Sequence, residues 1–396
     1  MNSNKNAQLI DGVIGAITGA IGSKPSVLHE PSFNGNEWQY LKECLDSTFV
    51  SSVGKFVDQF EIELAKYTGA DYAIAVVNGT AALHAALKVI GVGTGDEVLV
   101  PTVTFIATAN AVSYCNATPH FFDCLPNDLG IDFTKLRDYL VRNTRQVSGL
   151  CINKNTNRAI KAIVPMHVFG HPVAMDELLA LCKEFNIELI EDAAESLGSF
   201  YRGKHTGTFG KIGTLSFNGN KIITTGGGGA LLTSDPLLAK RLKHITTTSK
   251  IPHPWNYYHD EIGFNYRLPN LNAALGCAQV EVLDSFINKK RELYEIYKKS
   301  FEGVNGVRLI SEPSGCKSNY WLQGIIMDDE FKYLRDPILK SANDLGIGAR
   351  PLWTLMHQLE IYTQCPRMDL SNAESMVGRV INIPSSPNLI MDHNNG

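Results

Sequence analysis

The sequence has no C-x-x-C pair, although eight cysteines are spread along its 396 residues. The absence of such pairs argues against a zinc ribbon or a dithiol redox centre as the basis of function. Scattered cysteines in a long chain are typical of reduced, buried thiols. We therefore expect a cytoplasmic protein without a metal site.

Basic tracts are also absent, and the charges nearly balance, with 36 Lys and Arg against 40 Asp and Glu. Without a basic patch, nucleic acid is not an expected partner. The only long apolar run near the start, residues 9–22, contains Asp11 and four glycines and is too short to cross a bilayer. Its length alone would also suit a signal peptide, but only Lys5 precedes it. We expect a helix packed on the body of the protein, and no membrane partner.

Alternation of strand and helix patterns from residue 72 to residue 235 predicts a mainly parallel sheet covered on both faces, an α/β fold. The expected strands lie at 72–77, 97–100, 118–122, 160–165, 187–190 and 214–217, with helices at 81–90, 107–114 and 175–186. A long helical stretch at 271–303 then changes the pattern. We divide the chain into residues 1–269, an N-terminal segment and large domain, and 270–396, a smaller C-terminal α+β domain with a bridging helix.

Lys221 lies on the connection between two expected strands, and four glycines, residues 226–229, follow it. These glycines allow another group to approach the main chain closely. A partly desolvated lysine has a lowered pKa, and its neutral amine can attack a carbonyl to form a Schiff base. Most lysines are solvated surface charges, so this interpretation needs support from other residues.

Three other segments place functional groups at the ends of strands. Gly79 and Thr80 separate a strand from a helix, which presents free backbone N–H groups to an anion, although a simple capped helix has the same pattern. Phe105 follows a strand where ligands bind in open sheets, although it would also suit a core. Asp192 ends an apolar strand, where its carboxylate needs a cationic partner unless it caps a helix.

These groups converge because the carboxyl ends of parallel strands meet at one edge of a sheet. Together they are the parts that pyridoxal 5′-phosphate requires. The aldehyde would take Lys221, the ring nitrogen Asp192, and the phosphate Gly79, Thr80, Ala81 and the Ser216 hydroxyl. The sequence therefore predicts a cofactor site with Lys221 as the catalytic residue.

Five motifs resemble the DegT/StrS family of pyridoxal-phosphate nucleotide-sugar aminotransferases, which have the type I (aspartate aminotransferase-like) fold. They are NGTAALHAAL, PTVTFIATANAV, EDAAESLGS, SFNGNKIITTGGGG and GFNYRLPNLNAALGCAQ, within a resemblance that spans about residues 31–389. The resemblance implies that Phe105 stacks on the ring and that Asn265 touches the phosphate of a neighbouring subunit, in a homodimer with shared sites. Where many members have Gln, this chain has Glu195, which the resemblance implies lies beside the ring's 3′ oxygen.

Within the family, FVSSVGKFVDQFE and GNKIITTGGGG resemble enzymes of legionaminic-acid and perosamine synthesis. This likeness implies transfer of an amino group from glutamate to C4 of a nucleotide-linked 4-keto-6-deoxy sugar, for surface polysaccharide or nonulosonic acid. His167 and Ser52 are substrate-side candidates by position. The alternatives are amination at C3, a cofactor-binding regulator without turnover, and an enzyme acting on a free amino acid. Lys221 argues against relatives that carry histidine there and remove a hydroxyl.

Overall fold

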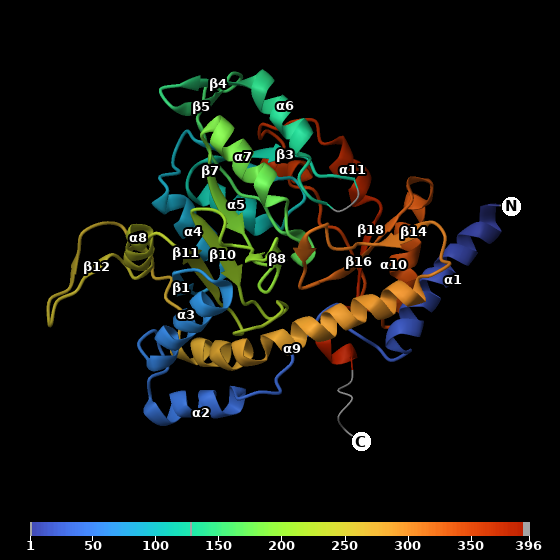
Figure 1. Ribbon diagram of the computed structural model, residues 1–396, viewed down its shortest axis with the longest axis horizontal. Helices are drawn as coiled ribbons and strands as arrows, with labels where there is room; N and C mark the ends of the chain where they lie inside the picture. Colours follow the sequence, from blue (N-terminus) through green and yellow to red (C-terminus); the bar gives the residue numbers. More distant parts are fainter. Residues whose placement is uncertain (1, 127–128, 391–396) are drawn as a thin grey trace.

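The computed structural model describes residues 2–126 and 129–390, and its centre is a seven-stranded sheet (Figure 1). The strand order is β1-β11-β10-β7-β6-β2-β3, in which β11 alone is antiparallel to its neighbours. The strands are β1 (Tyr72–Val76), β2 (Glu97–Pro101), β3 (Thr118–Phe122), β6 (Ile160–Ile163), β7 (Glu188–Asp192), β10 (Ile212–Ser216) and β11 (Gly229–Thr233). The predicted α/β class and mainly parallel sheet are confirmed.

Both faces of this sheet are buried, because every residue of β2 and β11 is buried and successive side chains of β1 enter different hydrophobic clusters. In β1, Ile74 and Val76 pack in the cluster that contains α4 (Gly79–Val89), α5 (Ile106–Tyr114) and α7 (Met175–Phe185). Ala73 and Ala75 face the cluster of α3 (Lys55–Thr68) and α9 (Asn270–Ser300). Short continuous apolar runs are the pattern that such doubly covered strands require. The predicted strands and helices of this region therefore occur with small shifts of their ends.

A smaller antiparallel sheet, in the order β14-β16-β18-β17, lies beside the first (Figure 1). Its strands are β14 (Val307–Leu309), β16 (Gln323–Met327), β17 (Arg350–Pro351) and β18 (Val380–Ile383), with α10 (Arg335–Asp344) and α11 (Ser371–Val377). The long helix α9 runs beneath both sheets and links them. The division of the chain at residues 269 and 270 stays a prediction, and its end at 396 lies outside the described residues.

The expected N-terminal helix is α1 (Asn2–Ile21), which packs on α9 and α10 rather than on the large sheet. The next helix, α2 (Glu37–Ser47), also lies on α9. Helical spacing predicts that Trp38, Cys44 and Leu45 share one face, yet of these three only Cys44 is buried, and Trp38 and Leu45 are 83% and 61% exposed. The reason is a polar anchor on the buried side, where Gln279 Nε2 donates to Glu37 Oε1 at 2.6 Å.

Several shorter elements complete the fold. They are α6 (Phe133–Asn143), α8 (Pro236–Thr246), β4 (Thr144–Val147), β5 (Leu150–Asn153), β8 (Phe200–Tyr201), β9 (Lys204–His205), β12 (Lys250–Ile251), β13 (Tyr258–His259), β15 (Cys316–Lys317) and five 3-10 turns at Val168–Gly170, Asp329–Leu334, Met356–Gln358, Glu360–Tyr362 and Pro387–Leu389. The β12–β13 hairpin projects from the body of the molecule (Figure 1). None of the described helices has the length and apolarity that crossing a membrane requires.

Candidate functional site

A cavity of about 390 Å³ opens at the carboxyl ends of β7 and β10, beside the N-terminus of α4. This is the edge at which open α/β sheets bind their ligands. Seven residues predicted from the sequence line it: Gly79, Thr80, Phe105, Asp192, Glu195, Ser216 and Lys221. The convergence expected from the strand pattern is therefore present.

Lys221 lies on the loop between β10 and β11, which closes on itself through backbone hydrogen bonds. Phe217 N–H donates to the Gly228 carbonyl at 2.8 Å, and Lys221 N–H donates to the Asn218 carbonyl at 3.0 Å. The lysine side chain is 13% exposed, with Nζ 3.4 Å from Glu195 Oε1. Nζ also lies 4.0 Å from the ring centroid of Trp321. The amine is therefore held at the cavity wall between a carboxyl and an aromatic face.

Asp192 ends β7 and is almost fully buried. Its Oδ2 accepts a hydrogen bond from Thr108 Oγ1 at 2.7 Å, and its Oδ1 accepts one from Ala194 N–H at 3.2 Å. Burial raises the pKa of this carboxyl above its usual value, and these hydrogen bonds and the charge of Lys221 oppose that rise. A cation placed against Asp192 would offset the cost of burying its negative charge.

Glu195 is equally buried, and its Oε1 is the carboxyl oxygen that lies 3.4 Å from Lys221 Nζ. Its Oε2 accepts a hydrogen bond from Phe169 N–H at 2.9 Å. Burial raises the pKa of Glu195 to about 7, although the charge of Lys221 acts to lower it. The side chain can therefore gain or lose a proton near neutral pH.

The N-terminus of α4 forms another part of the cavity wall. Asn78 caps this helix, because its Oδ1 accepts a hydrogen bond from Ala81 N–H at 2.7 Å. A Cβ added at Gly79 would lie 2.9 Å from Ser216 Cβ, so glycine permits the helix to approach the end of β10. The first N–H groups of a helix lack partners within it and attract anions, and the hydroxyls of Thr80 and Ser216 lie beside them.

Four predicted residues do not line this cavity. The N–H of Ala81 is used by the cap, and Ser52 lines a separate cavity of about 200 Å³. His167 is fully buried, with Val173 N–H donating to its Nδ1 at 3.1 Å and its Nε2 3.3 Å from Glu191 Oε2. Asn265 is exposed and contacts Arg267, whose Nε lies 3.4 Å from its Oδ1.

The cavity also contains residues that sequence reasoning missed. Thr108 lies one turn after Phe105 on α5, so its position in a predicted helix could have identified it. Trp321 and Trp353 come from the region of the smaller sheet, and no sequence spacing connects them with the strand ends. The ring of Trp353 lies 6.5 Å from that of Phe105, which is half exposed at this wall.

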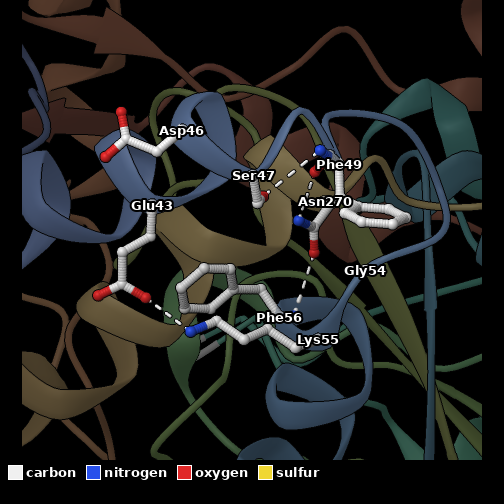
Figure 2. A pocket seen from close by; sticks show the side chains of 8 residues that line it. All are labelled: Glu43, Asp46, Ser47, Phe49, Gly54, Lys55, Phe56 and Asn270. Atoms are coloured by element: carbon white, nitrogen blue, oxygen red, sulfur yellow. Dashed lines mark hydrogen bonds and ion pairs between the residues drawn. The ribbon is translucent and has the colours of Figure 1, made fainter.

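A second, larger cavity of about 660 Å³ lies between α2, α3 and the start of α9. Figure 2 shows the side chains that line it. It is lined by Glu43, Asp46, Ser47, Phe49, Gly54, Lys55, Phe56 and Asn270, none of which was predicted as a site residue. Asn270 fixes the loop at 49–54, because its Nδ2 donates to the Phe49 carbonyl at 2.6 Å and its Oδ1 accepts from Phe56 N–H at 3.1 Å. These contacts explain the shape of the loop and bring no reactive group together.

Comparison with known proteins identifies the family to which this chain is similar. The sequence profile of the DegT/DnrJ/EryC1/StrS aminotransferase family matches residues 31–395. GDP-perosamine synthase of Escherichia coli O157:H7 is 39% identical over 362 residues, which are 91% of this chain and 93% of that protein. The putative pyridoxal phosphate-dependent aminotransferase EpsN of Bacillus subtilis is 36% identical over 93% of each chain.

Solved structures agree with the fold. The aminotransferase PseC of Helicobacter pylori, involved in biosynthesis of pseudaminic acid, superimposes with a TM-score of 0.85 and 26% identity. The alignment covers 93% of this chain and 95% of PseC. The type I fold predicted from the sequence is therefore confirmed.

Proposed function

Because the chain belongs to the DegT/DnrJ/EryC1/StrS aminotransferase family, we propose that it moves an amino group from glutamate to C4 of a nucleotide-linked 4-keto-6-deoxy sugar. The observation that carries this proposal is the meeting of Lys221, Asp192 and the α4 N-terminus in one cavity. A lysine amine, a buried carboxylate and an anion cradle are the three contacts that a phosphorylated pyridine aldehyde needs.

The protein is an aminotransferase that uses pyridoxal 5′-phosphate. When bound, this group supplies an aldehyde that carries the amino group and a protonated ring that withdraws electrons. The residues present fit it. Lys221 would hold the aldehyde carbon, Asp192 the ring nitrogen, and Gly79, Thr80 and Ser216 the phosphate. We propose that Phe105 covers the ring from α5 and that Glu195 lies at its 3′ oxygen.

The chain's own residues then move the protons. Lys221 Nζ would take a proton from the donor carbon that bears the amino group and would deliver it to the carbon that the aldehyde supplied, acting as base and then as acid. Asp192 would keep a proton on the ring nitrogen, because a buried carboxylate favours a cation placed against it. Thr108 Oγ1 orients this carboxylate through its 2.7 Å hydrogen bond.

The names of relatives support the choice of substrate. GDP-perosamine synthases from three bacteria are 36–39% identical to this chain, and an altrosamine transaminase that acts on a UDP-linked sugar is 31% identical. We propose that the acceptor is a nucleotide-linked keto sugar of this kind. The link to legionaminic acid rests on the sequence resemblance, as does the use of glutamate.

We also propose that the active unit is a homodimer with shared sites. Asn265 is exposed on this chain and does not line its cavity, as expected of a residue that serves a partner's phosphate. The role of Ser52 as a substrate contact stays a prediction. We do not extend that role to His167, because its two ring nitrogens already contact Val173 and Glu191.

The test combines one variant with a substrate screen. Lys221→Ala should lose both turnover and the visible absorbance of the lysine-bound cofactor, whereas the exposed Lys240→Ala should keep both. Wild-type protein should convert a GDP-, UDP- or dTDP-linked 4-keto-6-deoxy sugar to an amine in the presence of glutamate. An amine at C3 would reassign the acceptor carbon, and cofactor binding without any amine product would favour the regulator.

A further inference from the structure

We propose that Thr104 is a positioning residue that acts on Asp192 through Thr108, in a relay of two hydroxyl groups whose protons both point toward the carboxylate. The relay consists of Thr104 Oγ1, Thr108 Oγ1 and Asp192 Oδ2. This inference rests on the proposed function, in which Asp192 faces the ring nitrogen of the cofactor. Thr104 does not line the cavity, so it acts on the cofactor only through its neighbours.

The three groups form a continuous chain of hydrogen bonds. Thr104 Oγ1 lies 2.9 Å from Thr108 Oγ1, and Thr108 Oγ1 donates to Asp192 Oδ2 at 2.7 Å. All three residues are at most 3% exposed, so water competes little for these hydrogen bonds. The relay therefore belongs to the buried side of the cavity wall.

The number of protons fixes the direction of the relay. Each threonine hydroxyl has one proton to donate, and an ionised carboxylate has none. Because Thr108 gives its proton to Asp192, the contact between the two hydroxyls must use the proton of Thr104. Hydrogen bonds aligned in this way polarise one another, so the proton of Thr104 strengthens the bond that Thr108 makes to the carboxylate.

A second acceptor, Met166 Sδ, shows how the relay would change if Asp192 were neutral. Thr104 Oγ1 lies 2.8 Å from this thioether sulfur, which is a weak acceptor. A protonated Asp192 would donate to Thr108, and the last hydroxyl proton would then turn to sulfur. Burial raises the pKa of Asp192, and the hydrogen bond from Thr108 opposes that rise. Since a carboxylate is the stronger acceptor, the relay favours the ionised Asp192 that a protonated ring nitrogen needs.

The start of α5 sets this geometry. Thr104 lies two residues before the helix, and Thr108 lies in its first turn, where Thr108 N–H donates to the Phe105 carbonyl at 3.2 Å. The segment before the helix is also fixed to the sheet, because Thr102 N–H donates to the Phe122 carbonyl at 3.0 Å. The relay therefore connects the fixed segment between β2 and α5 to the end of β7.

The test loads the full chain with pyridoxal 5′-phosphate labelled with ¹⁵N at its ring nitrogen, and solid-state NMR reports how far that nitrogen is protonated. Asp192→Asn should move the signal farthest toward that of a neutral ring, because it removes the carboxylate. Thr108→Val should move the signal less, and Thr104→Val less again. In protein that already carries Thr108→Val, adding Thr104→Val should have no further effect, because the connecting hydroxyl is gone.

Matched variants separate the relay from simple packing. Thr104→Ser keeps the hydroxyl and should retain the wild-type signal, whereas Thr104→Ala should reproduce the change even if valine prevents folding. Thr144→Val removes a buried hydroxyl that donates to the Leu140 carbonyl in α6, and should leave the signal unchanged. In turnover assays Thr104→Val should lower kcat roughly 2- to 10-fold with little change in KM, as expected for the loss of one hydrogen bond.

The NMR signals distinguish failure of the relay from failure of the proposed function. Equal signals for Thr104→Val and Thr104→Ser would overturn the relay, as would an effect of Thr104→Val that is the same with and without the Thr108 hydroxyl. If Asp192→Asn also left the signal unchanged, the assignment of Asp192 to the ring nitrogen would fail, and the relay with it. Because the NMR measurement uses no keto sugar or donor, an error in the proposed substrate leaves it unaffected.

Discussion

At the scale of single residues, Glu195 should make the stability of the protein depend on pH. Its pKa rises from 4.5 to about 7 on folding because burial disfavours the charged form. A raised acid pKa means that the folded state binds the proton more tightly, so the stabilisation is complete below the unfolded pKa and is lost as pH rises through about 7. Between pH 5 and pH 8 the titration of this one group should therefore lower the free energy of unfolding by about 2 to 3 kcal/mol.

Urea unfolding of wild type and Glu195→Gln at both pH values, without added cofactor, measures this contribution. Every other titrating group is common to the two proteins, so the difference between their unfolding free energies isolates Glu195. We expect the unfolding free energy of Glu195→Gln to rise relative to that of wild type as the pH is raised. Parallel pH dependence of the two proteins would show that Glu195 titrates near its ordinary value when folded.

The same residues show how far sequence reasoning reaches at this scale. Lys221 and Asp192 were predictable because strand ends are visible as apolar runs followed by a polar residue. Trp321 was not, because its place beside Lys221 depends on how the smaller sheet packs on α9. His167 was assigned to the substrate side, and only the structure shows its ring turned to Glu191.

At the scale of elements, α1 should be required for stability although it lies outside the matched family region. Val13 is fully buried in the cluster that α1 forms with α9 and α10. Val13→Asp buries a carboxylate without a partner and should lower the unfolding free energy by about 3 kcal/mol or more. Gln8→Asp, on the exposed side of the same helix, is the matched control and should change stability by less than about 0.5 kcal/mol.

Urea unfolding of the two variants checks this prediction, and equal stability would show that α1 is only loosely attached. The position of α1 illustrates what element patterns leave open. Its helical pattern was visible in the sequence, but its partners α9 and α10 lie far along the chain and begin only at Asn270 and Arg335. Likewise β11 is the second of the two strands expected on either side of Lys221, whereas its antiparallel direction is seen only in its pairing with β1 and β10.

At the scale of the whole molecule, an active site built by two subunits predicts a result that a site built by one subunit does not. Lys221 lines the cavity of its own chain, while Asn265 is exposed and outside it. If Asn265 serves the partner's phosphate, Lys221→Ala and Asn265→Ala should each be impaired as pure homodimers. A mixed dimer would hold one site with both defects and one site with neither.

Unfolding and refolding the two variants together in equal amounts, or co-expressing them, should therefore restore activity. Random pairing makes half of the dimers mixed, and one of the two sites in each is intact, so activity should reach about one quarter of wild type. If Asn265 instead served its own chain, every site in a mixed dimer would carry one defect, and mixing would restore nothing. Sedimentation of the mixture fixes the number of chains in the active species, and a fully active monomer would rule out sharing altogether.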